Sequence, residues 1–101
     1  NDYPPGYHQI GNLRNTTDES LVYQHNIGIG VRGKSELDAV VEVLLDEPIR
    51  ITLIELIPFN NSRADLDHIS GGPGYNNVKL RLTPQRNRGL SYTVKIWGLK
   101  N

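Results

Sequence analysis

The chain has 101 residues, no cysteine, and 11 acidic and 11 basic residues, so its formal net charge at neutral pH is zero. This length fits a single domain spanning residues 1–101, and the missing cysteine excludes disulfide frameworks, thiolate zinc clusters and cysteine nucleophiles. No apolar run approaches the roughly 18 residues of a membrane helix, and the net charge is neutral. We therefore expect no membrane span and no nucleic-acid partner.

The neutral total hides an asymmetry along the chain. Residues 1–70 hold all eleven acidic residues and five basic ones, a net charge of −6, whereas residues 71–101 hold six basic residues and no acid, a net charge of +6. One interpretation is that strands from the two segments pair, so that their surface charges complement each other across a sheet. The other is a basic patch for an anionic partner. The neutral total favours the first.

The first third of the chain contains one predicted strand. NDYPPGYH (1–8) is Pro-rich and should be an extended lead-in, and IGNLRNTTDE (10–19) is polar and turn-rich. SLVYQHNIGIGV (20–31) mixes β-branched and aromatic residues and predicts a strand. Its glycines, Gly28 and Gly30, indicate a bulge or a close approach of another backbone segment.

The segment ELDAVVEVLLDE (36–47) fits two patterns. Its leucines and valines fit a helical stripe, but strict alternation from Leu37 to Leu45, with Asp38 and Glu42 on the opposite face, fits a strand better. The valines and the DEP turn that follows favour the strand.

The segment IRITLIELIPF (49–59) predicts a further strand. Its alternation slips at Leu53–Ile54, which indicates a bulge or a stretch that is buried on both faces. NNSRADLDHIS (60–70) reads as a polar connection.

The last third predicts a hairpin. Apolar and polar residues alternate over 76–83 and again over 90–97, and PQRNRG (84–89) joins them as a turn. We expect these two strands to be adjacent and antiparallel. With turns between all segments and no secure helix, the chain should be all-β: an antiparallel β-sandwich or barrel of about six or more short strands.

Two glycine motifs resemble phosphate-binding loops. GIGVRG (28–33) matches G-x-G-x-x-G, but no βαβ units follow, so we interpret it as part of a strand and a turn. GGPG (71–74) lacks the Gly-Lys-Ser/Thr ending, and its proline removes a backbone N–H donor. We interpret this motif as a tight turn.

The acid–histidine cluster of Asp65, Asp67 and His68 is a poor cation site, because two carboxylates without a fixed loop are weak ligands. His8 and His25 have no acidic partner at a relay spacing, and no serine lies in a G-x-S-x-G elbow. We expect no catalytic residue, no metal site and no cofactor.

Two Asn-x-Ser/Thr sequons begin at Asn15 and Asn60, in polar segments where a glycan could reach solvent. The chain also starts without Met or an apolar leader, as a processed product would. These features agree with a secreted, extracellular glycoprotein, whereas the absence of cysteine favours a reducing compartment.

The C-terminal third resembles the signature of the insect family named after multiprotein bridging factor 2. The matching positions are Gly71 to Tyr75, the strand Val78 to Leu82, Gln85-Arg86, Gly89 and Trp97-Gly98. A weaker match covers Gly11, Arg14, Asp18 and Leu21. The chain departs from the pattern at Pro84, where a small polar residue is usual, and at Trp97, where tyrosine is usual.

The resemblance implies a small all-β protein, usually made with a signal peptide. It provides no catalytic residues of the family to carry over to this chain. Most such proteins are associated with saliva, gut, haemolymph or defence, so the main expectation is a secreted, non-enzymatic protein that acts by binding or assembly. The alternative is an intracellular coactivator that bridges a nuclear receptor and the general transcription machinery. A third hypothesis is a carrier of a small apolar ligand between the sheets.

Assembly is predicted from the C-terminal strand. Trp97 falls on the face of this strand that otherwise carries polar side chains. It should therefore either face outward, as an anchor for a partner, or cap the core at the strand end. If this strand lies at an open edge of a sheet, Lys95 is its only charged side chain that would oppose pairing with a strand of another molecule. We expect a homo-oligomer, most simply a dimer, with Trp97 and Arg86 near its contact; other protein partners are possible.

Overall fold

The computed structural model describes residues 5–13, 19–29, 38–60, 62–85 and 89–100. This part of the chain forms seven strands and no helix. The strands are β1 (His8–Gly11), β2 (Glu19–Ile29), β3 (Ala39–Leu44), β4 (Ile49–Pro58), β5 (Ala64–Gly71), β6 (Asn77–Pro84) and β7 (Leu90–Lys100).

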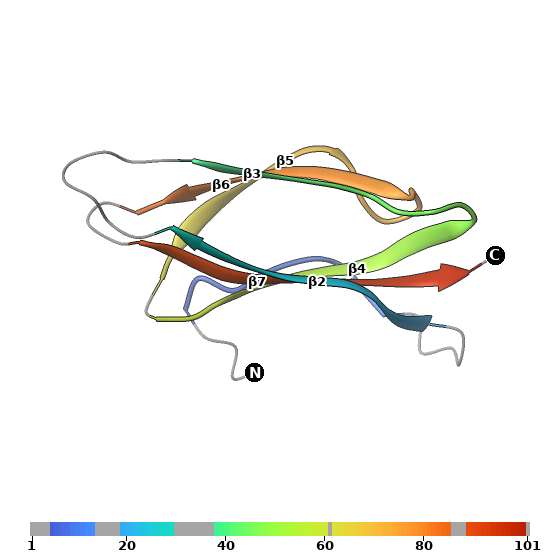
Figure 1. Ribbon diagram of the computed structural model, residues 1–101, viewed down its shortest axis with the longest axis horizontal. Helices are drawn as coiled ribbons and strands as arrows, with labels where there is room; N and C mark the ends of the chain where they lie inside the picture. Colours follow the sequence, from blue (N-terminus) through green and yellow to red (C-terminus); the bar gives the residue numbers. More distant parts are fainter. Residues whose placement is uncertain (1–4, 14–18, 30–37, 61, 86–88, 101) are drawn as a thin grey trace.

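The strands form two antiparallel sheets that face each other, as the two layers in Figure 1 show. One sheet has four strands in the order β1-β4-β7-β2, and the other has three in the order β3-β6-β5. The prediction of an antiparallel β-sandwich is therefore confirmed.

The core lies between the sheets and is filled by alternate residues of each strand. In β6 and β7 every second side chain is buried, from Val78 to Pro84 and from Leu90 to Gly98. Ten side chains are less than 2% exposed: Tyr92, Ile51, Ile54, Leu56, Leu80, Leu82, Leu90, Ile96, Val78 and Val94. Strict alternation follows from the pleat, which points successive side chains to opposite faces of a sheet.

The predicted hairpin between residues 76–83 and 90–97 is wrong. Both segments are strands, but β6 pairs with β3 and β5, whereas β7 pairs with β4 and β2. The connection after Pro84 therefore crosses from one sheet to the other. The apolar faces of β6 and β7 point into the same core from opposite sides, and a hairpin would show the same alternation.

The hairpin of the fold is instead β5–β6, turned by the GGPG motif. Gly71, Gly72 and Gly74 have φ of +71°, +108° and +89°, which L side chains rarely adopt. The motif is a tight turn, as predicted. The segment 60–70 is not merely a polar connection, because most of it is β5, an edge strand whose side chains are mainly exposed.

The same turn ties the two sheets together at one end of the sandwich. The Gly74 N–H donates to the Ile51 carbonyl oxygen at 2.9 Å, and the Ile51 N–H donates to the Tyr75 carbonyl oxygen at 2.8 Å. Since Ile51 belongs to the four-stranded sheet, the β5–β6 turn holds β4 against the three-stranded sheet.

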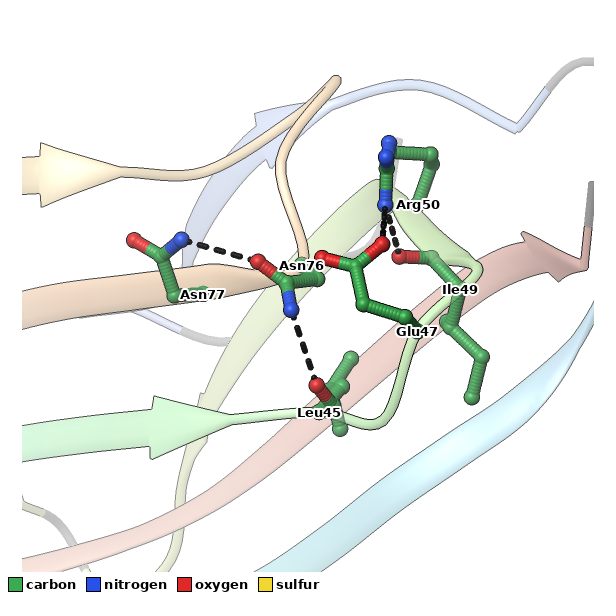
Figure 2. A network of polar contacts seen from close by, with 6 residues as sticks. All are labelled: Leu45, Glu47, Ile49, Arg50, Asn76 and Asn77. Carbon is green, nitrogen blue, oxygen red and sulfur yellow. Dashed lines mark hydrogen bonds and ion pairs between the residues drawn. The ribbon is translucent and has the colours of Figure 1, made fainter.

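Asparagines after this turn fix the end of β3 (Figure 2). The Asn76 Nδ2 group donates to the Leu45 carbonyl oxygen at 3.0 Å, and the Leu45 N–H donates to the Asn76 carbonyl oxygen at 2.8 Å. In the β3–β4 turn, Arg50 contacts Glu47 at 2.8 Å. The last residues of β3 are thereby held in one position.

The strand interpretation of residues 36–47 is confirmed for Ala39–Leu44, which form β3. The slip in β4 is also confirmed, because the pairing with β7 shifts register between Ile51 and Leu53. Four consecutive side chains are buried around this shift: Ile51, Thr52, Leu53 and Ile54.

The bulge in β2 lies between Leu21 and Tyr23, not at Gly28. A Cβ placed on Gly28 would meet nothing within 4 Å, so nothing packs against that face of the residue. Gly30 lies outside the described residues. The strand β1 was also missed, because its four residues lie at the boundary of two segments that read as lead-in and turn.

The acidic and basic halves of the chain do pair across the sheets, as the first interpretation of the charge asymmetry predicts. Three acidic residues lie directly opposite basic residues in the strand register: Glu42 opposite Lys79, Asp67 opposite Arg81, and Glu55 opposite Lys95. Opposite charges at such positions stabilise a sheet, and the charges of the two halves offset each other within one molecule.

Candidate functional site

Trp97 lies on the outer face of the four-stranded sheet. Its neighbours in β7, Ile96 and Gly98, are buried toward the core, while Trp97 itself is half-buried on the opposite face. Of the two alternatives for Trp97, the outward orientation is the one in the structure, and its role at an interface stays a prediction. Its strand is not an edge, however, because β7 is flanked by β4 and β2, so the argument from an unprotected C-terminal edge is wrong.

A carboxylate holds the indole in place. The Trp97 Nε1–H donates to Glu55 Oε1 at 3.0 Å, and the Tyr7 hydroxyl donates to Glu55 Oε2 at 2.7 Å. Hydrogen bonds to a charged acceptor are roughly twice as strong as neutral ones. The two aromatic side chains are therefore fixed on either side of one carboxylate.

Apolar side chains flank Trp97 along its row of the sheet. Leu53 in β4 and Leu21 in β2 are its direct cross-strand neighbours. Leu53 is 5% exposed although it faces away from the core, whereas Leu21 is 41% exposed. In the neighbouring row on the same outer face of the sheet, Glu55 in β4 lies opposite Lys95 in β7.

We call these five residues, Leu21, Leu53, Glu55, Lys95 and Trp97, the outer platform. They come from the two central strands and from β2, so their backbone positions are set by the sheet register. Tryptophan is enriched among the anchor residues of protein interfaces, and charged groups such as those of Glu55 and Lys95 are typical of the polar rim around an anchor. The platform is therefore the strongest candidate site among the described residues.

Comparison with known proteins places the chain in a family. A family model described as transcription activator MBF2 matches residues 11–98. The chain belongs to the MBF2 family. Comparison with curated proteins and with solved structures finds no match.

Membership of the MBF2 family corrects the main functional expectation. A secreted protein of saliva, gut or defence does not agree with a family that is described as a transcription activator, whereas the coactivator alternative does. The resemblance to this family is confirmed. The localisation of the chain is a separate question that the family description does not test, so it stays a prediction, as do an insect source, the carrier hypothesis and the single domain.

Both predicted glycosylation sites, Asn15 and Asn60, lie within the residues that the family model matches. That they carry glycans stays a prediction. Asn15 lies outside the described residues, and so does Arg86, the second predicted interface residue. Asn60 is exposed in a turn with φ of +54°, a conformation that asparagine tolerates better than most residues.

The serine of the second sequon has a structural role that the sequence did not indicate. Ser62 is only 3% exposed; its hydroxyl donates to the Gly89 carbonyl oxygen at 2.9 Å and accepts from the Ser91 N–H at 3.0 Å. These bonds attach the β4–β5 connection to the start of β7.

The acid–histidine cluster on β5 lies at the protein surface. Asp65, Asp67 and His68 are exposed, and the His68 Nε2 atom lies 2.8 Å from the Gly71 carbonyl oxygen of its own turn. Within the described ranges, no group of three or more His, Cys, Asp or Glu side chains is placed to hold a metal ion. Nor does any helix there have the length and apolar character to cross a bilayer.

Tyr92 has a structural role that its place in an alternating strand did not indicate. Its hydroxyl donates to the Gly6 carbonyl oxygen at 2.6 Å and accepts from the Ala64 N–H at 3.0 Å. The His8 ring stacks on it at 6.4 Å, and His8 Nε2 lies 2.7 Å from the Ala64 carbonyl oxygen. Burial raises the pKa of the Tyr92 hydroxyl above 10.0; the bond from Ala64 opposes this, and the charge of Asp65 adds to it.

Proposed function

We propose that this chain acts in transcription activation by binding another protein through the outer platform, and that it works by binding and not by catalysis. The observation that carries the proposal is Trp97, an outward-facing indole in a central strand of the sheet. The description of the MBF2 family as a transcription activator supports the process in which it acts.

The platform is built to bind with little loss of conformational freedom. The indole of Trp97 is held by Glu55, and Leu53 is already buried on the outer face. A surface whose side chains are fixed before binding avoids the cost of about 0.5–1.5 kcal/mol for each side chain that must be ordered. Leu21, at 41% exposure, supplies apolar area that a partner would cover.

A reporter assay tests this function. The chain is fused to a DNA-binding domain, and transcription from a reporter gene that carries the matching DNA sites is measured in cells. We expect activation above the level of the DNA-binding domain alone. Leu21→Glu should remove most of this activation, because it places a carboxylate in the apolar row beside Trp97.

The matched control is Ile69→Glu, which changes an aliphatic side chain of similar exposure, 44%, on the three-stranded sheet. This variant should activate like the unchanged chain. Circular dichroism of both purified variants would verify that each is folded. The platform proposal is contradicted if the two variants activate equally well, and the transcriptional role is contradicted if the unchanged chain does not activate.

A second copy of the chain is a further candidate for the partner of the platform. Glu55 and Lys95 lie side by side across β4 and β7, so a two-fold axis through the platform can set each carboxylate against the ammonium group of the other copy. This arrangement, with Trp97 at the contact, would give the dimer that the sequence predicts.

Sedimentation of the purified chain at micromolar concentration tests the dimer. We expect a dimer that Trp97→Ala converts to a monomer. A chain that sediments as a monomer at this concentration, with or without the substitution, would exclude self-association through the platform while leaving the reporter assay as the test for other partners.

A further inference from the structure

The three-stranded sheet has an open edge along β3, which Figure 1 shows at one side of that layer. Among the described strands, β3 pairs with β6 alone. An edge strand presents unpaired N–H and C=O groups that can form a ladder with another extended segment. This edge lies on the opposite sheet from the outer platform, so it is a separate surface.

The register shows which backbone groups point to the open edge. Leu45 donates its N–H to the Asn76 carbonyl oxygen, which makes this pair the hydrogen-bonded type. In an antiparallel ladder the two types alternate, so Val41 and Val43 bond to β6. The N–H and C=O groups of Val40, Glu42 and Leu44 therefore point away from β6, toward the open edge.

The side chains of the same residues lie on the exposed face of the strand. Val40 is 53% exposed and Leu44 is 78% exposed, the largest value among the exposed large apolar residues of the described chain. Acidic residues occupy the positions between and beyond them. We call this set the β3 stripe, and all of its members are exposed: Asp38, Val40, Glu42, Leu44 and Asp46.

The stripe combines two kinds of recognition. Its backbone groups offer a hydrogen-bonding ladder, which any extended segment can use, and its side chains set the pattern that a segment must match. Side chains directly opposite in a sheet interact, so apolar residues favour apolar partners and carboxylates favour basic partners. The complementary strand therefore alternates basic and apolar residues on one face.

A second copy of β3 does not fit this edge. When two copies of β3 form a symmetric antiparallel pair centred on Glu42, the two Glu42 carboxylates lie opposite each other. When the pair is centred on Val40 or Leu44 instead, Glu42 lies opposite Asp38 or Asp46. The intermediate registers place Glu42 opposite Val40 or Leu44. Each of these symmetric registers therefore places two acids opposite each other or places a carboxylate opposite an apolar side chain.

The remaining open edges of the described chain do not match the stripe either. The β5 edge carries Asp65 and Asp67, and the described residues of β1 and β2 include no lysine or arginine. The basic residues of the described strands all belong to central strands: Arg50 in β4, Lys79 and Arg81 in β6, and Lys95 and Lys100 in β7. Arg63 lies in the β4–β5 connection. No open edge of the described chain therefore supplies the complementary strand.

We propose that the β3 edge binds an extended segment of another protein in which basic and apolar side chains alternate on one face, adding it to the sheet as a fourth strand. The edge is prepared for this role, because Asn76 holds Leu45 by two hydrogen bonds and so fixes the end of β3 (Figure 2). A strand that is already extended and fixed loses little freedom on binding.

Hydrogen exchange measured by NMR tests the proposal with a synthetic peptide. The probe is a peptide of about nine residues with lysine, valine, lysine, valine and lysine at every second position and threonine between them, a normal strand length. The amides of Val40, Glu42 and Leu44 should exchange rapidly in the free protein and become protected when the peptide is added. A peptide of the same composition with the order scrambled should protect them much less.

Charge reversal tests the pattern. Glu42→Lys should weaken binding of the lysine peptide about tenfold or more and should restore it for a peptide with glutamate at the central position. The control is Asp65→Lys, which makes the same reversal on the other edge of the sheet, opposite the uncharged Thr83. It should leave the affinity unchanged.

Three results would overturn the proposal. The first is rapid exchange of the Val40, Glu42 and Leu44 amides at saturating peptide. The second is protection of these amides in the free protein, which would mean that the edge is already covered. The third is an equal loss of affinity in Glu42→Lys and Asp65→Lys. Leu44→Asn, at a site too exposed to matter for folding, gives a second variant that should weaken binding.

Discussion

At the scale of single residues, Tyr92 joins three parts of the chain that are distant in sequence. Its ring is fully buried in β7, while its hydroxyl bonds to Gly6 near the N-terminus and to Ala64 at the start of β5. A buried hydroxyl that both donates and accepts leaves two backbone groups dependent on it. The cost of removing it should therefore exceed that of a typical surface hydroxyl.

Tyr92→Phe is expected to lower the free energy of unfolding by about 1–3 kcal/mol, because the Gly6 carbonyl and the Ala64 N–H lose their partner in a buried site. Urea unfolding followed by circular dichroism measures the change. The control is Tyr75→Phe, since Tyr75 is 59% exposed, and this substitution should change stability by less than about 0.5 kcal/mol. Equal effects of the two substitutions would contradict the role assigned to the Tyr92 hydroxyl.

The pKa of Tyr92 also predicts a pH dependence at the alkaline end. Burial raises the folded-state pKa above 10.0, so the unfolded chain releases this proton at lower pH than the folded chain does. The stabilisation is fully present below pH 10 and is lost as the pH rises from about 10 through the folded-state pKa. Stability should therefore fall more steeply above pH 10 in the unchanged chain than in Tyr92→Phe, as urea unfolding at a series of pH values would show. Parallel curves would contradict this.

At the scale of elements, the β5–β6 turn shows two separate demands on glycine. A Cβ on Gly71 would overlap the Asn77 carbonyl oxygen, whereas a Cβ on Gly74 would meet nothing within 4 Å. Both residues have positive φ. Gly71 is therefore required for space and for conformation, and Gly74 for conformation alone.

Replacing each glycine by alanine separates these demands. Gly74→Ala should cost about 1–2 kcal/mol for the unfavourable backbone conformation. Gly71→Ala should cost distinctly more, because the strand β6 must also shift away from the new Cβ. Gly28→Ala, in an extended and open position, is the control and should change stability little. Thermal unfolding of the three variants gives the order, and a cost for Gly74→Ala that equals or exceeds that of Gly71→Ala would contradict it.

At the scale of the whole molecule, the two sheets share one core. The buried cluster contains Leu80 and Leu82 from the three-stranded sheet and Ile54 and Ile96 from the four-stranded sheet. The turn after β5 adds backbone bonds between the sheets. Neither sheet can bury its apolar face without the other, so the described strands should unfold together.

Leu80→Ala tests this coupling. Leu80 is 0% exposed, so the substitution should cost about 2–5 kcal/mol through lost contacts and a cavity. The slowest-exchanging amides of β7, in the other sheet, should lose protection by the same free energy as those of β6. Loss confined to β6 would mean that the sheets unfold separately. Val40→Ala, at an exposed position of the same sheet, is the control.

Alternation in the sequence was enough to predict strands and a sandwich, but not the partners of each strand. Residues 76–83 and 90–97 carry apolar faces that fill the same core, and this pattern does not distinguish neighbours in one sheet from strands in facing sheets. The strand β5 was missed because an edge strand with exposed side chains has the composition of a loop. The site was predicted only in part. Alternation left Trp97 either facing outward or capping the core, whereas Glu55 lies 42 residues from Trp97, and Tyr7 lies 48 residues from Glu55, separations that no local pattern bridges.

Trp97 is the only tryptophan in the chain, and it lies on the outer platform. Its fluorescence therefore comes from one known face of the molecule, without any dye or substitution. A partner that covers the platform should displace water from the indole and move the emission to shorter wavelength. A segment that binds at the β3 edge, on the opposite sheet, should leave the emission unchanged. One optical titration of the unmodified protein can thus assign a new partner to one surface or the other.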